Sequence, residues 1–162
     1  MGASGNVATT AILGLAALGR KLAPRVGLVT ELPPFEPLGL APWETLVVGG
    51  HEIRQPRLVA AARELADQHV VPRELVEACR EDLEAIEARV RPGIAYGCGK
   101  AICQLAEVPV AGDEVAPWSL VEQVAADLQN FQTAHALDRV VVVNLASTEP
   151  PTPAGLPESW LE

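Results

Sequence analysis

The first residues of the chain form a glycine-rich turn that runs directly into an apolar segment with helical character. The spacing is Gly2-x-x-Gly5-x-x-Ala8, and Asn6 and Val7 follow the second glycine. Glycines let a backbone approach a pyrophosphate closely, and the free amides at a helix N-terminus attract its negative charge. The pattern therefore predicts a dinucleotide-binding turn. A plain glycine turn at a frayed terminus would have the same spacing.

Two carboxylates follow segments that are predicted to be strands. Glu31 follows residues 26–30, and Glu52 follows residues 46–48 in the turn Gly49–Ile53. A carboxylate at a strand end can accept hydrogen bonds from the ribose hydroxyls of NAD, and it repels the 2′-phosphate of NADP. An acid is expected about 20 residues after the glycines, which favours Glu31 on spacing. Either residue could also be an ordinary solvated carboxylate.

A third candidate segment follows four consecutive valines, Val140–Val143. Such a run lacks the alternation of a half-exposed strand and predicts a central parallel strand buried on both faces. The polar residues 144–149 come next. Ligands of doubly wound sheets bind at the carboxyl ends of strands, so these small side chains could line the nicotinamide ribose. Alternatively, they form a polar loop that caps the strand.

The elements that must position these residues alternate between helix and strand. Apolar stripes predict helices over residues 6–22, 58–65 and 75–90, the first covered on most sides. A capping box at Ser119–Glu122 opens a further helix, and residues 92–113 look irregular. This alternation predicts an α/β fold with a Rossmann-like, doubly wound parallel sheet. The strand that normally precedes a glycine turn of this kind is missing, so we expect the chain to be part of a larger protein.

Composition excludes several classes of function. The 162 residues are 49% hydrophobic, which suffices for the core of one domain, and a net charge of −9 disfavours binding to nucleic acid. The apolar residues 7–18 are too few to span a membrane. The three cysteines and three histidines lack metal-ligand spacing, so we expect no metal site and reduced thiols in a cytoplasmic protein.

Taken together, these segments resemble the inositol-3-phosphate synthases, also called myo-inositol-1-phosphate synthases. The likeness runs in order along nearly the whole chain. The stretches that carry it are residues 2–10, 27–31, 38–42, 47–53 and 137–149.

The resemblance implies an NAD-dependent isomerase that converts D-glucose 6-phosphate to 1D-myo-inositol 3-phosphate, in inositol and phospholipid biosynthesis. In that family, bound NAD oxidises the sugar at C5, C6 closes onto C1, and the hydride is then returned. The full-length family also implies a homo-oligomer. By the family's pattern, the pyrophosphate would contact Gly2, Gly5, Asn6 and Val7. Glu52, beside Ile53, becomes the preferred ribose ligand over Glu31, and Ala146 and Thr148 would lie near the nicotinamide.

The chain departs from the family in its catalytic part. The family holds the sugar phosphate and transfers protons with lysines of a second domain, whereas this chain has only Lys21 and Lys100. We therefore expect residues 1–149 to form an NAD-binding domain and the proline-rich residues 150–162 to be a linker toward an absent catalytic domain. No catalytic residue is assigned. The alternative is a stand-alone NAD-binding or assembly module that works with a separate catalytic partner.

Overall fold

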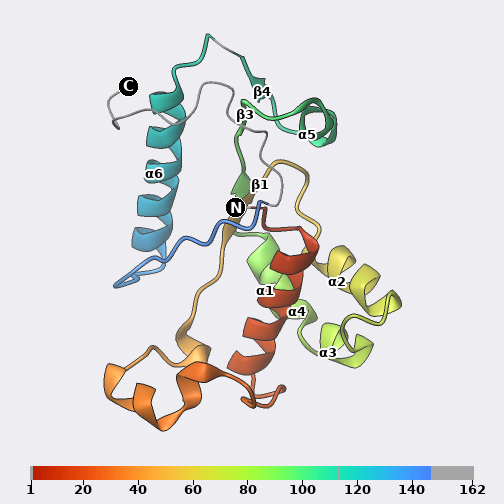
Figure 1. Cartoon of the computed structure of the whole chain (residues 1–162), viewed down its shortest axis with the longest axis vertical. Helices are drawn as coiled ribbons and strands as arrows, with labels where there is room; N and C mark the ends of the chain where they lie inside the picture. The colour runs from red at the N-terminus through yellow and green to blue at the C-terminus, as the bar shows by residue number, and fades with distance from the viewer. Residues whose placement is uncertain (1, 113, 147–162) are drawn as a thin grey trace.

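The computed structural model of the chain describes residues 2–112 and 114–146, drawn in colour in Figure 1. The α-helices are α1 (Asn6–Gly19), α2 (Leu58–Asp67), α3 (Arg73–Ala78), α4 (Arg80–Glu87), α5 (Lys100–Leu105) and α6 (Pro117–Ala134). The 3-10 helices are η1 (Val29–Glu31), η2 (Pro33–Leu38) and η3 (Trp43–Thr45). The strands are β1 (Gly50–Glu52), β2 (Val90–Pro92), β3 (Ala95–Tyr96) and β4 (Val110–Ala111).

The apolar core lies among four helices. Helices α1, α2, α3 and α4 pack against one another, whereas α6 stands apart from this cluster (Figure 1). The stripe that predicted α2 is the face that this helix buries, with Leu58 and Ala62 inaccessible to solvent. The largest fully buried apolar side chains of the cluster are Leu13, Leu58, Leu83, Val76 and Cys79. Burial of such side chains is the main favourable term in folding.

The strands within the described residues form two small parallel sheets. β1 pairs with β2, so that Gly50 lies opposite Val90 and Glu52 opposite Pro92. β3 pairs with β4 in the same sense. Parallel strands need crossover connections, and the helical segment 58–87 supplies one between β1 and β2. The fold is therefore mixed α/β with parallel strand pairing, as the sequence predicted at this coarser level.

Three strand predictions were wrong in position or in kind. Residues 26–30 form no strand, because Gly27 adopts a left-handed φ of +86° and the chain then enters η1. The second strand begins at Gly50 rather than at residue 46. Val140–Val143 are not a buried strand, since Val141 is 78% exposed and the next two valines are 58% exposed. Burial on both faces requires neighbouring strands and covering helices, which the described residues do not place around this segment.

Several helix predictions also need correction. The helix predicted over residues 75–90 is broken at Cys79, whose backbone leaves the helical region, and Val90 belongs to β2. Helix α6 begins at Pro117, so Ser119 lies inside its first turn and does not cap it. The helix predicted over residues 6–22 ends at Gly19. Most of its residues are buried or half-buried, as expected, whereas Val7 in its first turn is 69% exposed.

Residues 92–113 are more regular than expected, since they contain β3, α5 and β4. Among the helices that the structure describes, none combines the length and apolarity needed to cross a membrane.

Candidate functional site

The glycine turn lies at the carboxyl end of strand β1. The amides of Gly2 and Ala3 both donate to the carbonyl of His51, at 3.0 and 3.2 Å. Helix α1 starts immediately afterwards, with Gly5 as its N-cap in an extended conformation. The N-terminus of α1 therefore lies beside a strand end, which is where doubly wound folds bind their ligands.

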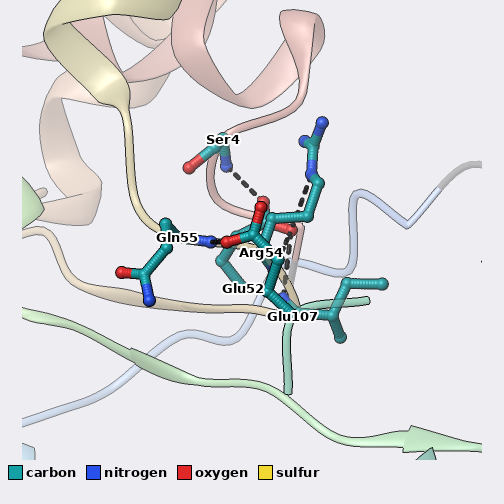
Figure 2. Close-up of polar contacts among 6 residues, drawn as sticks. Ser4, Glu52, Arg54, Gln55 and Glu107 are labelled. Atoms are coloured by element: carbon teal, nitrogen blue, oxygen red, sulfur yellow. Dashed lines mark hydrogen bonds and ion pairs between the residues drawn. The ribbon is translucent and has the colours of Figure 1, made fainter. Parts of the chain in front are cut away.

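Glu52 joins this turn to the strand with its side chain. Its Oε2 accepts a hydrogen bond from the Ser4 amide at 2.8 Å, and its Oε1 accepts one from the Ile53 amide at 3.0 Å (Figure 2). Weaker contacts of 3.4 and 3.5 Å reach the same Oε1 from the backbone and side chain of Arg54. The Glu52 side chain is only 3% exposed. A buried carboxylate needs such donors, because the desolvation of an unpaired charge is costly.

Close backbone approach at the site depends on two glycines. A Cβ on Gly50 would lie 2.8 Å from the Cβ of Ala3, which is closer than side-chain carbons normally come. Gly2 has a left-handed φ of +72°, and a Cβ there would lie 3.4 Å from the carbonyl oxygen of Leu145. The turn thus fits between β1 and the segment that follows the valines. Ala146, whose amide bonds the side-chain oxygen of Asn144, lies in that segment.

Two hydroxyl groups near the turn have no hydrogen-bond partner among the described residues. They belong to Ser4, which is 9% exposed, and to Thr9, which is fully buried. An unsatisfied buried hydroxyl is unusual and calls for an explanation. The amides of residues 2–5 all donate within the protein, and the Ser4 hydroxyl is enclosed, so the described part of the turn itself offers no open donor. The donors that fit an anionic group such as a pyrophosphate are the amides that begin α1, which have no partner within the helix.

The structure brings most of the predicted site residues together. The turn contains Gly2 and Gly5, and Glu52 and Ile53 lie beside it. The approach of Leu145 to Gly2 brings Ala146 close to the turn as well. Asn6 and Val7 are exposed on the first turn of α1, where backbone amides have no partner within the helix. Thr148, with the neighbouring Ser147 and Glu149, lies outside the described residues.

Glu31, the alternative ribose ligand, belongs to η1 and does not lie at the glycine turn. It accepts a hydrogen bond from the indole of Trp43 at 2.6 Å and pairs with Arg25 at 3.3 Å. Trp43 packs near Gly19 at the opposite end of α1 from the glycine turn. The Trp43 hydrogen bond, helped by Arg25, lowers the pKa of the Glu31 carboxyl. These contacts give Glu31 a local structural role.

Sequence reasoning did not single out the polar partners that surround the site. His51 Nε2 lies 3.1 Å from Asp127 Oδ2 and thereby links β1 to α6. Glu107 accepts a hydrogen bond from the Gln55 amide at 2.9 Å, and its own amide donates to the Ile53 carbonyl. These pairs join residues that are 52 or more positions apart in sequence, so no local spacing reveals them. Ser4 has a local signal, because it lies between the two glycines.

Comparison with known families agrees with the resemblance seen in the sequence. A family model for the NAD-binding domain of myo-inositol-1-phosphate synthase matches residues 30–155. The matched segment contains Glu52 and Ala146, whereas the glycine turn precedes it. A search of curated proteins gave no significant match. The cofactor of this domain family is NAD, and the chain, matched over most of its length, belongs to the myo-inositol-1-phosphate synthase family as an N-terminal NAD-binding part.

Proposed function

We propose that this chain is the NAD-binding portion of an inositol-3-phosphate synthase that converts D-glucose 6-phosphate to 1D-myo-inositol 3-phosphate. The observation that carries the proposal is the attachment of the glycine turn to the carboxyl end of β1. Family membership supplies the cofactor, and this geometry offers its pyrophosphate a position.

In this proposal, the turn and the first turn of α1 bind the pyrophosphate. Gly2 and Gly5 allow close approach, and Asn6 and Val7 are exposed residues in the first turn of α1, where backbone amides have no partner within the helix. Each charge at a helix N-terminus gains about 0.3–1 kcal/mol when exposed, so several donors must act together. The hydroxyl of Ser4 would add a donor if the turn shifted to expose it, since its oxygen is enclosed and has no partner among the described residues.

Glu52 is proposed to hold the turn in its binding shape. Its Oε2 accepts one hydrogen bond, from Ser4, so acceptor capacity remains for a ribose hydroxyl. Ribose contact would require a shift of the turn, because the side chain is 3% exposed. Three roles remain predictions. They are the ribose contact of Glu52, the part played by Ile53 and the nicotinamide contacts of Ala146 and Thr148.

We further propose that residues 1–149 form one NAD-binding unit and that residues 150–162 lead to a catalytic domain. A strand preceding the glycine turn would complete a doubly wound sheet in the whole enzyme. The exposure of Val141 and Val142 supports this, because a completed sheet with its covering helices would bury apolar side chains that are exposed here. The whole enzyme is proposed to be a cytoplasmic homo-oligomer.

When bound, NAD would take a hydride from the sugar and return it within one turnover. The residues described here would bind and orient the cofactor. Proton transfer needs other groups, because the lysines of this chain lie elsewhere. Lys21 follows the C-terminal end of α1, and Lys100 is exposed at the start of α5. We therefore expect the isolated chain to bind NAD without cyclising glucose 6-phosphate.

Calorimetric titration with NAD+ tests the proposal directly. A Cβ on Gly5 would meet only the Gly2 carbonyl, at 3.5 Å, which is an ordinary contact, so Gly5→Val should fold while its side chain occupies the ligand position. The matched control is Gly14→Ala, because a Cβ there meets nothing within 4 Å. Saturable binding lost in Gly5→Val and kept in Gly14→Ala supports the site. An absence of heat at millimolar NAD+, or inositol phosphate formed by the pure chain, contradicts the proposal.

One observation bears on the alternative, a module that works with a separate catalytic chain, because such a module needs an apolar surface for its partner. An open groove of about 560 Å³ lies between β3 and α6. Its lining is almost entirely apolar and comprises Ile94, Tyr96, Pro117, Leu120, Val121, Val124, Ala125 and Leu128. In-frame translation of the flanking DNA separates the two proposals. A lysine-rich continuation supports the single enzyme, and stop codons on both sides support the module.

A further inference from the structure

Two thiols lie side by side at the start of helix α5. The sulfur atoms of Cys98 and Cys103 are 3.6 Å apart, and the Cys103 thiol also lies 3.4 Å from the Cys98 carbonyl. Gly99 is the N-cap of α5, so Cys98 precedes the cap and Cys103 is the fourth helical residue. Side chains at these two positions pack against each other in many helices, which explains the contact.

We propose that Cys98 and Cys103 form a reversible disulfide, making this turn a redox-modified site on the protein. A disulfide holds its sulfur atoms about 2.05 Å apart, so the two atoms need to approach by about 1.5 Å. Gly97 and Gly99 flank Cys98, and a Cβ on either glycine would meet nothing within 4 Å. The backbone around Cys98 therefore has room to close this distance.

The oxidant in the proposed reaction is a low-molecular-weight disulfide such as oxidised glutathione. One thiolate of the pair attacks a glutathione sulfur, forms a mixed disulfide and expels one glutathione thiolate, which takes up a proton. The second thiolate of the pair then attacks the protein sulfur of that mixed disulfide and expels the other glutathione. Two protein thiols and one glutathione disulfide thus become one protein disulfide and two glutathione thiols. Reduced thioredoxin or excess reduced glutathione reverses the reaction.

The surroundings of the pair set its reactivity. Both cysteines are partly exposed, whereas Cys79 is fully buried in the helical core. Burial, helped by the neighbouring Cys103, raises the pKa of the Cys98 thiol. Because the thiolate is the attacking species, oxidation should accelerate as pH rises above neutrality. Transient disulfides of this kind are typical of redox-sensing sites in reducing compartments.

The position of Lys100 makes the test direct, because trypsin cleaves after it, between the two cysteines. The whole chain is incubated with oxidised glutathione, free thiols are blocked with iodoacetamide, and the protein is digested without reductant. We expect the peptide that ends at Lys100 to remain joined to the peptide that begins at Ala101 until dithiothreitol is added. Cys79 is buried in the folded protein, so unfolding before digestion should expose it to iodoacetamide. We therefore expect to recover it in a labelled peptide.

Two variants and one further measurement complete the test. Cys103→Ser should stop at the mixed disulfide and carry one glutathione on Cys98, and Cys98→Ser should carry it on Cys103. In the oxidised protein, hydrogen exchange should slow at the amides of Ile102 and Cys103, which bond the Gly99 carbonyl. Wild-type protein that accumulates two glutathione adducts, or whose thiols react only after unfolding, would overturn the proposal. None of these outcomes depends on NAD binding.

Discussion

Replacing Glu52 with glutamine tests whether one buried carboxylate holds the site together. The Glu52 carboxylate accepts hydrogen bonds from the Ser4 amide at 2.8 Å and the Ile53 amide at 3.0 Å. Glutamine offers one acceptor oxygen and one NH₂ group. In Glu52→Gln, the NH₂ group takes the place of one carboxylate oxygen. One of the two backbone amides then faces a donor and loses its hydrogen bond.

The expected loss follows from the strength of such bonds. A hydrogen bond to a charged group contributes about 1.5–3 kcal/mol, and a buried donor left unpaired costs about 1–3 kcal/mol. The neutral amide is easier to bury than the carboxylate, which offsets part of the loss. We expect Glu52→Gln to lower the free energy of unfolding by about 2–3 kcal/mol, a large share of the roughly 5–15 kcal/mol typical of a domain.

Urea unfolding followed by circular dichroism measures this difference. With a slope of about 2 kcal/mol per molar urea, the midpoint should fall by about 1–1.5 M at constant slope. The matched control is Glu107→Gln, because the exposed Glu107 carboxylate accepts a single hydrogen bond within the described residues, from the Gln55 amide. The control should lose less than about 1 kcal/mol. If both variants lose the same stability, Glu52 does not fasten the turn to β1.

Four further changes test the packing around the site and in the core, and the titration of one buried thiol. Gly50→Ala should lower the free energy of unfolding by about 1–3 kcal/mol, because its Cβ would lie 2.8 Å from that of Ala3. Gly14→Ala should instead raise this free energy by about 0.5–1 kcal/mol, and urea midpoints that do not separate the two variants would contradict the reasoning. Leu13→Ala removes a side chain of a residue only 2% exposed and should cost about 2–5 kcal/mol in thermal unfolding; a smaller loss would mean that the helical cluster collapses around the cavity. Burial, with a contribution from Asp82, raises the pKa of the Cys79 thiol, so the folded chain keeps this proton to a higher pH than the unfolded chain. Stability from this group is therefore complete below the ordinary value of 9.0 and declines as pH rises through the folded pKa; an unchanged alkaline decline in Cys79→Ala would contradict the assignment.

The helices were predictable because their signals are local. The apolar stripe of α2 repeats at helical spacing, and the residues that predicted it, among them Leu58 and Leu65, are buried. The break at Cys79 was not predictable in the same way. The apolar stripe continues across Cys79, so the sequence pattern does not show that α3 and α4 are separate helices; the backbone of Cys79, outside the helical region, does.

The strands were less predictable because a strand is defined by its partners. Val140–Val143 have the composition of a buried strand, yet composition cannot show whether neighbouring strands are present. Residues 26–30 fail for a different reason. The left-handed conformation of Gly27 interrupts any extended segment, and a sequence does not reveal which glycines adopt it.

The site was predictable to the extent that it follows a general rule of α/β folds. That rule placed the glycine turn, Glu52 and residues 144–146 at one edge, and the structure brings these segments together. The spacing of Cys98 and Cys103 around an N-cap glycine also carried a local signal for their contact. The pairing of His51 with Asp127 carried none, because it depends on how α6 lies against β1.

The choice of glutamate at position 52 shows how the fold and the site depend on one carboxylate. Oε1 accepts a hydrogen bond from the Ile53 amide, which directly follows in the chain. Oε2 accepts one from the Ser4 amide across the site. An aspartate side chain is one methylene shorter, so it could satisfy the local amide but would have to draw the turn inward to reach Ser4. The turn is therefore shaped by the protein before any ligand arrives, and a pyrophosphate bound at the start of α1 need not supply the free energy of ordering it. The same coupling means that damage to this contact should weaken folding and binding together, whereas a change at the solvent-facing Val7 should affect binding alone.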